Sequence, residues 1–137
     1  MAIYHIAYHG YKHAPSADEM DKQLAMFNAG FAVAPHVEEF FVGRYAGNPA
    51  DGYHDAACLK FKNLDAYRIH IESPHGPDEA THLRENVARV RAFDILTAEE
   101  PADTSEKIIE LYKMRWERFP DVAKVLREDV ETHFPYL

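Results

Sequence analysis

Apolar side chains recur along the chain with two periods, one of two residues and one of three to four, and the changes between them divide the chain into elements. Residues 2–9 follow the two-residue period, which is typical of a strand whose successive side chains point to opposite faces. One face of this strand would carry Ile3, His5, Ala7 and His9, and the other face Tyr4, Ile6 and Tyr8.

A helical period comes next. Ser16 and Glu19 form a capping box, and the apolar stripe after it predicts a helix that ends near residues 30–34. A second strand is predicted over residues 37–44, and the turn-forming residues of the segment 45–52 predict a hairpin loop.

An acid and two histidines interrupt the apolar pattern of the following strand and helix. Residues 53–61 alternate as a strand, in which Asp55 lies on an otherwise apolar face. Asn63 suits the N-cap of the next helix, and Ser73-Pro74-His75 ends that helix, because the residue before a proline is disfavoured in the α region. We therefore expect Asp55, His70 and His75 to lie around one pocket.

A further helix is predicted to start at Gly76-Pro77, and residues 91–96 would form a fourth strand. The order of elements is then β-α-β-β-α-β, with the second helix broken in two. This is the order of the α+β ferredoxin-like fold, in which helices cover one face of a four-stranded antiparallel sheet. The other face would be bare, so we expect two sheets to pack face to face in a homodimer. The stripe of the further helix would be Ala80, Leu83, Val87 and Val90.

Residues 1–98 are therefore interpreted as a ferredoxin-like domain and residues 99–137 as a helical C-terminal extension. Asp103 and Glu106 suit the start of one helix, and Pro120 opens a short second one. The extension is too short and too polar for its own core, so we expect an arm that packs on the domain, at the mouth of the pocket, or on a partner subunit. Its inward stripe would be Ile109, Tyr112 and Trp116.

The composition of the chain indicates which kinds of partner and which cellular compartment to expect. The chain has 15 Lys and Arg against 23 Asp and Glu, a formal net charge of −8, which disfavours nucleic acid because phosphate binding needs a basic surface. Cys58 is the single cysteine, so a disulfide framework is excluded and a reducing, cytoplasmic setting fits. We expect no signal peptide and no membrane partner, because no apolar run reaches the roughly 18 residues of a span.

Five short motifs together resemble the stress-responsive dimeric α/β-barrel (Dabb) family over about residues 2–97. They are a first strand with a histidine near its start, a third strand that opens with GY and ends in K-F, the helix sequence N-L-D-A-Y, the break S-P-H and the final strand A-F-D-I. The resemblance implies a dimeric ferredoxin-like fold. Members include plant heat-stable stress proteins and olivetolic acid cyclase, which closes a polyketide by an aldol condensation without cofactor or metal.

The resemblance to that cyclase also implies site residues. The histidine of the cyclase's first strand matches His5, its third-strand histidine falls on Asp55, and its helix tyrosine falls on His70. The family pattern H-P-x-H reads S-P-H-G here, so Ser73 replaces the first histidine and His75 stands one place before the second.

The leading hypothesis is an enzyme that moves a proton beside a carbonyl group. It would be a cyclase, lyase or isomerase that acts without a cofactor on a small hydrophobic or aromatic carbonyl compound. Such chemistry needs a base with a pKa near the working pH, and histidine starts at about 6.5. His75 would be this base. Asp55 would hold an imidazole in one tautomer or act as the base itself, and His5 and His70 would polarise the carbonyl or carry the proton.

Three alternatives stay open. The aromatic residues, 8 Phe, 8 Tyr and 1 Trp, suit a non-catalytic dimer that binds a hydrophobic small molecule or acts as a scaffold. The nine histidines invite a metal site, with His5 and His9 on one face, although their spacing matches no compact signature such as H-E-x-x-H. A haem- or oxygen-using monooxygenase is suggested by fold analogy alone.

Overall fold

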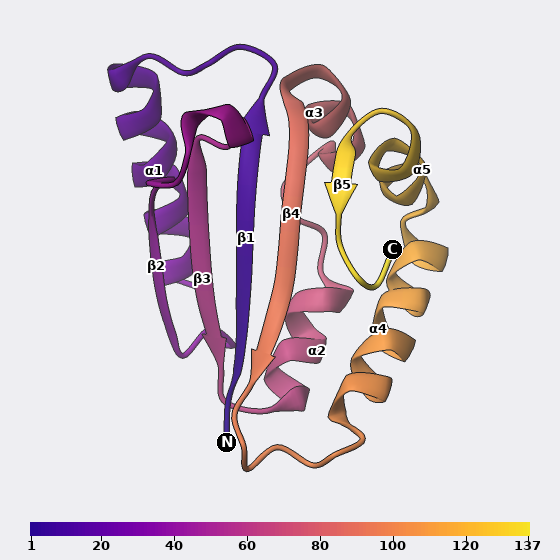
Figure 1. Ribbon diagram of the computed structural model, residues 1–137. Helices are drawn as coiled ribbons and strands as arrows, with labels where there is room; N and C mark the ends of the chain where they lie inside the picture. Colours follow the sequence, from indigo (N-terminus) through magenta and orange to yellow (C-terminus); the bar gives the residue numbers. More distant parts are fainter.

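One mixed sheet organises the computed structural model, which describes residues 1–137 (Figure 1). It contains five strands: β1 (Ile3–Tyr11), β2 (Glu39–Arg44), β3 (Asp55–Phe61), β4 (Val87–Leu96) and β5 (Glu131–His133). They lie in the order β2-β3-β1-β4-β5, and all neighbours are antiparallel except β4 and β5, which are parallel. The ferredoxin-like α+β prediction is confirmed for the first four strands, and the short β5 was not predicted.

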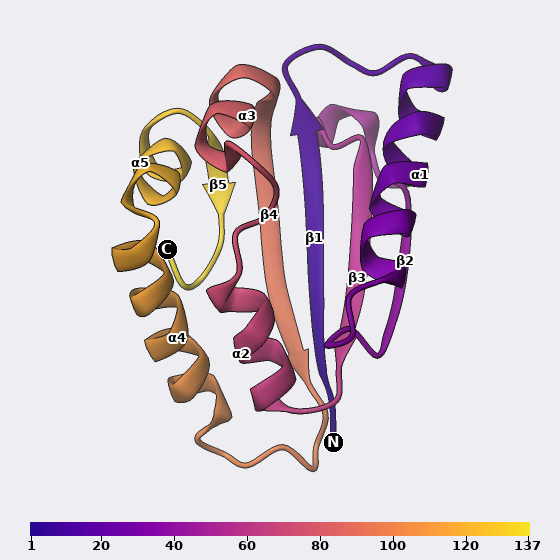
Figure 2. The same cartoon turned by 180° about the vertical axis from the view of Figure 1, so that it is seen from behind.

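Helices cover one face of this sheet. They are α1 (Ala17–Ala32), α2 (Leu64–Glu72), α3 (Glu79–Asn86), α4 (Thr104–Arg118) and α5 (Pro120–Glu128), and a short 3-10 turn spans Pro49–Asp51. Figure 2 shows α1 in front of β2 and β3, and α2 in front of β4. In Figure 1 only the short 3-10 turn lies in front of the opposite face of β1 to β4, and no α-helix covers it. None of the helices combines the length and apolar character needed to cross a membrane.

The short-range signals for helix ends hold. The Ser16 hydroxyl accepts from the Glu19 N–H at 3.2 Å, and the Glu19 carboxylate accepts from the Ser16 N–H at 3.0 Å. The Asn63 side chain accepts from the Ala66 N–H, and α2 ends just before Ser73, whose backbone is extended. These signals act within four residues, so tertiary contacts do not override them.

The predicted fourth strand begins too late. We expected Val87 and Val90 on a helix stripe, but α3 ends at Asn86 and β4 already starts at Val87. Val90 pairs with His9 of β1, and Val87 pairs with Tyr11, because β1 itself extends to Tyr11. The β-branched valines fit this ladder better than a helix, and the longer partner strand supplies the hydrogen bonds.

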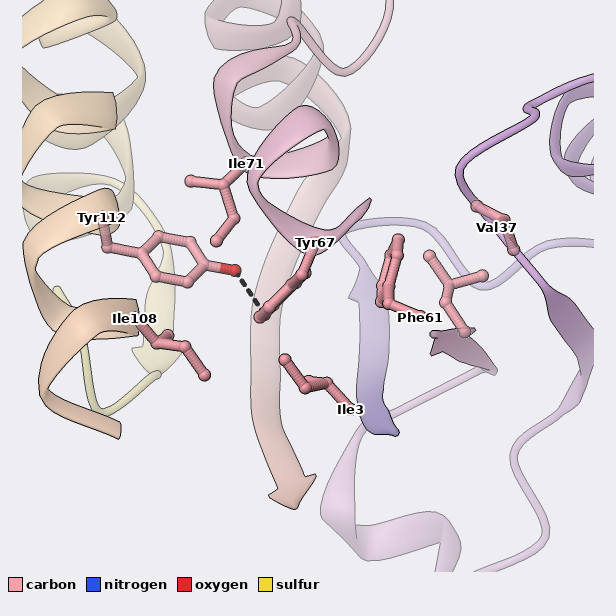
Figure 3. Packing of buried hydrophobic residues seen from close by; sticks show 8 residues of the cluster. Ile3, Val37, Phe61, Tyr67, Ile71, Ile108 and Tyr112 are labelled. Carbon is pink, nitrogen blue, oxygen red and sulfur yellow. Dashed lines mark hydrogen bonds between the residues drawn. The ribbon is translucent and has the colours of Figure 1, made fainter. Parts of the chain in front are cut away.

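The main core lies between the sheet, α2 and α4. Figure 3 shows Ile3 of β1 and Phe61 of β3 facing Tyr67 and Ile71 of α2, with Tyr112 of α4 behind them. Strands and helices that are distant in sequence therefore share one apolar cluster. Its members are Ile3, Val37, Leu59, Phe61, Tyr67, Ile71, Ile108 and Tyr112.

The C-terminal arm packs on this same core, and the predicted stripe is confirmed for Tyr112 and Trp116 but wrong for Ile109. Ile109 is 39% exposed, whereas Ile108 is fully buried and Arg115 is 3% exposed. Tyr112 is buried and Trp116 packs at the edge of the cluster, as expected. The three-to-four-residue period allows both stripes, and only the contact with α2 decides between them.

The uncovered face of the sheet is apolar and aromatic in part. Tyr4, Ile6 and Tyr8 point to this face of β1, opposite to the helices. Phe41 of β2 and Ile95 of β4, in register with this row, are 70% and 50% exposed. Such an exposed apolar patch on a sheet is typical of an interface.

Replacing Ile108 by alanine should lower the free energy of unfolding by about 2–5 kcal/mol, because it leaves a cavity where α4 meets the core. Urea denaturation followed by circular dichroism measures the change. The matched Ile109→Ala change, one residue along the same helix, should cost no more than about 0.5 kcal/mol. Equal losses in the two variants would contradict this account of how the arm packs.

Candidate active site

A histidine and a carboxylate meet where β1 and β4 run side by side. His5 and Asp94 are register partners, and the His5 Nδ1 lies 2.7 Å from the Asp94 Oδ1. The Asp94 side chain is 1% exposed and that of His5 is 13% exposed. Because a carboxylate only accepts, the His5 Nδ1 carries the proton. A neutral His5 then has its lone pair on Nε2.

A tyrosine from α2 also bonds to this carboxylate, and Tyr136 near the C-terminus interacts with it as well. The Tyr67 hydroxyl lies 2.8 and 2.9 Å from the two Asp94 oxygens and 3.0 Å from the His5 Nδ1. Behind it, the Tyr112 hydroxyl of α4 lies 2.8 Å from the Tyr67 hydroxyl (Figure 3, dashed line). Desolvation raises the pKa of both tyrosines, and Asp94 raises each further. Both are therefore protonated donors rather than bases.

Asp94 was not among the residues predicted for the site, although it is part of the A-F-D-I motif. The signal was present, because the two-residue period places Asp94 on the same face as Ala92 and Leu96. An acid on an apolar strand face was the argument used for Asp55, and it applies equally here.

A group of imidazoles adjoins His5. The ring of His70 lies 6.0 Å from that of His5 and 5.9 Å from that of His36, centre to centre. The ring of His75 stacks on His70 at 4.6 Å with an interplanar angle of 29°. The structure therefore brings three of the predicted residues together, His5, His70 and His75, and adds His36, which was not predicted.

The surroundings of this group favour neutral rings. Desolvation is the main cause that lowers the pKa of His70 well below its usual value, and His75, His5, His36 and Arg115 lower it further. Desolvation also lowers the pKa of His75, with the Arg115 guanidinium second. The His75 side chain is 41% exposed, so solvent screens part of the effect there.

Asp55 lies elsewhere, which corrects the expectation of one shared pocket. Its Oδ1 accepts from the His9 Nδ1 at 2.8 Å, and its Oδ2 accepts from the Tyr11 hydroxyl at 2.6 Å and the Gln23 amide at 2.7 Å. Asp55 does hold an imidazole, but this is His9, four residues beyond His5. At the usual rise of a strand that is about 13 Å along β1.

Two histidine–carboxylate pairs thus flank the middle of the sheet on its helix side. Between them Ala7 of β1 pairs with Ala57 of β3 and with Ala92 of β4. Ala7 and Ala57 remain partly exposed although both stand on inner strands. No bulky side chain from these strands fills the space above them, and we call these three residues the alanine floor.

The four predicted residues line neither of the two best-formed of the ten surface hollows. One, of about 330 Å³, lies by the start of α1 and is lined by residues such as Met20, Tyr45 and His54. The other, of about 540 Å³, lies between α2 and α4 and has mainly charged walls. No three His, Cys, Asp or Glu side chains gather in an arrangement that would hold a metal ion.

This chain is similar to known proteins in its three-dimensional structure. No protein-family model and no curated protein matches the sequence. A hydroxynitrile lyase from Passiflora edulis superposes with a TM-score of 0.56 at 20% identity, over 73% of this chain and 96% of that one. A Dabb family protein from Mesorhizobium loti gives a TM-score of 0.53 at 21% identity, over 69% and 95% of the two chains.

SnoaB of Streptomyces nogalater, a cofactor-independent oxygenase, gives a TM-score of 0.51 at 17% identity, over 74% of this chain and 97% of that one. A ferredoxin-like protein of unknown function from Bacteroides fragilis, with a TM-score of 0.51 at 19% identity over 69% and 94% of the two chains, is described as dimeric. The chain has the Dabb-like, ferredoxin-like fold. About a quarter of it has no counterpart in these proteins.

The free energy of unfolding should decrease as the pH is lowered below about 6.5, because the folded protein holds His70 and His75 neutral. The unfolded chain takes up protons near the ordinary histidine pKa of 6.5, whereas the folded chain, whose histidine pKa values are lowered, does not. The free energy of unfolding is therefore full above this pH and decreases as the pH falls toward the folded pKa values.

Urea denaturation at pH 7.5, 6.5 and 5.5 measures this slope. The His70→Gln variant should show a shallower slope than the parent protein, and a His13→Gln variant at an exposed position should keep the parent slope. A slope that His70→Gln leaves unchanged would show that these rings are not the source.

Proposed function

We propose that the protein is an enzyme that moves a proton next to a carbonyl carbon, without a cofactor, on a small and partly apolar compound. The observation that carries the proposal is the His5–Asp94 pair, buried on the helix side of the sheet and completed by the Tyr67 hydroxyl. Such a pair presents a neutral imidazole in a fixed tautomer, which is the form a general base requires.

In the proposed reaction His5 Nε2 removes a proton from a carbon beside the carbonyl, or from the hydroxyl of a hydroxynitrile. The imidazolium formed would be stabilised by Asp94, which stays ionised. Bond formation or release of the leaving group would then consume the electron pair, and the proton would return from Nε2 to the product or the leaving group. The apolar body of the substrate would lie beside His5 over the small side chains of Ala7 and Ala57, both of which are partly exposed.

His5 is better suited to the role of base than His75, which the sequence favoured. The His75 Nε2 donates to the His70 carbonyl at 3.2 Å, so only its Nδ1 could accept a proton, and no carboxylate bonds to this ring as Asp94 bonds to that of His5. The lowered pKa of His75 also makes it a weak acceptor of a proton. His70 and His75 would instead line the site as neutral, polarisable rings, and Asp55 with His9 would bind a second polar group of the substrate across the alanine floor.

The fold likeness supports the class of chemistry, since the similar structures include a hydroxynitrile lyase and a cofactor-independent oxygenase. A second candidate function is a binding protein without turnover. It is favoured by the two best-formed hollows, neither of which is lined by His5, His70 or His75.

Two probes test the proposal. Deuterium exchange into 4-phenyl-2-butanone, followed by NMR, reports proton removal beside a ketone, and benzaldehyde release from mandelonitrile reports hydroxynitrile cleavage. His5→Gln and Asp94→Asn should each lower the rate of whichever reaction the parent protein catalyses by roughly 10²–10⁴-fold. His5→Gln removes the base, and Asp94→Asn removes the group that fixes its tautomer. His13→Gln, at an exposed position, serves as the matched control. If the parent protein is no faster than the His5→Gln variant with either probe, the result would favour a binding protein without turnover.

We also propose that a second copy covers the uncovered face of the sheet, as a homodimer. Phe41→Glu should weaken self-association about a hundredfold, because two exposed phenyl rings per dimer would be replaced by charges. Analytical ultracentrifugation measures the dissociation constant. Met26→Glu on α1, 65% exposed but on the helix side, is the control and should leave it unchanged. A monomeric parent protein would contradict the proposal.

A further inference from the structure

The C-terminal arm reaches the histidine group through a buried arginine. Arg115 of α4 has a side chain only 2% exposed. Its Nη1 donates to the carbonyl of Ile71 at 2.7 Å and to that of Ser73 at 2.6 Å. These carbonyls end α2, where the helix leaves its last backbone acceptors without partners of its own. Arg115, which belongs to α4, therefore acts as the C-terminal cap of α2.

The same guanidinium also fixes the segment that carries His75. Its Nη2 donates to both oxygens of Glu79, at 2.9 and 3.2 Å. Glu79 in turn accepts from the His75 backbone N–H at 3.1 Å. One side chain thus joins the residues immediately before His75 to the acid four residues after it.

This segment does not hold its shape by local preference. Gly76 has φ = 85° and Asp78, a residue with a side chain, has φ = 52°, both in the left-handed region. The Asp78 side chain makes no capping bond to α3. Glycine adopts this region freely, but in a residue with a side chain, such as Asp78, it persists only where the surroundings determine it. The bonds from Arg115 and Glu79 are the surroundings that the structure provides.

We infer that the C-terminal arm is a built-in part of the histidine site, in which Arg115 is a positioning residue that holds His75 against His70. The arm has a second link to the site, since Tyr112 of the same helix bonds to the Tyr67 hydroxyl that contacts Asp94. The catalytic meaning of the inference rests on the proposed function, but the placement of the rings does not.

The charges around the two rings come from four other elements. His5 lies on β1, His36 before β2, Glu79 on α3 and Arg115 on α4. Arg115 is the permanent positive charge among them, and it disfavours a proton on either ring. Its loss should both separate the rings and let them titrate closer to ordinary histidine.

The test uses protein labelled with ¹³C and ¹⁵N in histidine and needs no substrate. In Arg115→Gln, the nuclear Overhauser contacts between the His70 and His75 rings should be lost, and both rings should take up protons at higher pH than in the parent protein. Arg118→Gln, an exposed arginine on the same helix, should leave both observations unchanged.

Arg115→Gln leaves Glu79 as an unpaired, largely buried charge, so the double variant Glu79→Gln/Arg115→Gln removes both partners. It should show the same loss of ring contact. Intact ring contacts and an unchanged titration in either folded variant would overturn the inference, even where stability is lower. Failure of the double variant to fold would also count against it, since Arg115 would then be needed for folding rather than for placement. None of these readouts depends on whether the protein turns over a carbonyl compound.

Discussion

A carboxylate buried among strands and helices is the constraint on which this structure depends. The Asp94 side chain is 1% exposed, and an ionised carboxylate is costly to bury unless donors surround it. The donors include His5 on β1, Tyr67 on α2 and Tyr136 near the C-terminus, and Tyr112 on α4 supports Tyr67. Satisfying this one group therefore fixes the first strand, the second helix and the arm relative to one another. It also fixes the tautomer of His5, which is the property that a general base would need.

The imidazoles beside this pair are neutral for a related reason, namely the cost of placing charges close together. His70 and His75 stack closely near the guanidinium of Arg115, so protons on these rings would place like charges next to one another. The site therefore combines a histidine held by a carboxylate with histidines held neutral. Environments that differ in this way are how proteins assign distinct acid and base roles to residues of one type.

The second pair, His9 and Asp55, repeats the arrangement at the other end of the alanine floor. Its carboxylate also receives a tyrosine hydroxyl and an amide, and no lysine or arginine is bonded to it. The fold places both pairs on the helix side because the two-residue period of β1 keeps His5 and His9 on one face.

The sequence by itself determined what depends on near neighbours: the capping box at Ser16, the break after α2, the faces of β1 and the order of elements that defines the ferredoxin-like fold. Only the tertiary structure decided which carboxylate meets which histidine, because strand register pairs His5 with Asp94 and His9 with Asp55 across gaps of 89 and 46 residues. It also decided where β4 begins, since Val87 and Val90 fit a helix as well as a strand, and which face of α4 turns inward, since the helical period allows two neighbouring stripes. Local preferences act over a few residues, whereas register and helix packing are settled by contacts between distant segments, which no local pattern records.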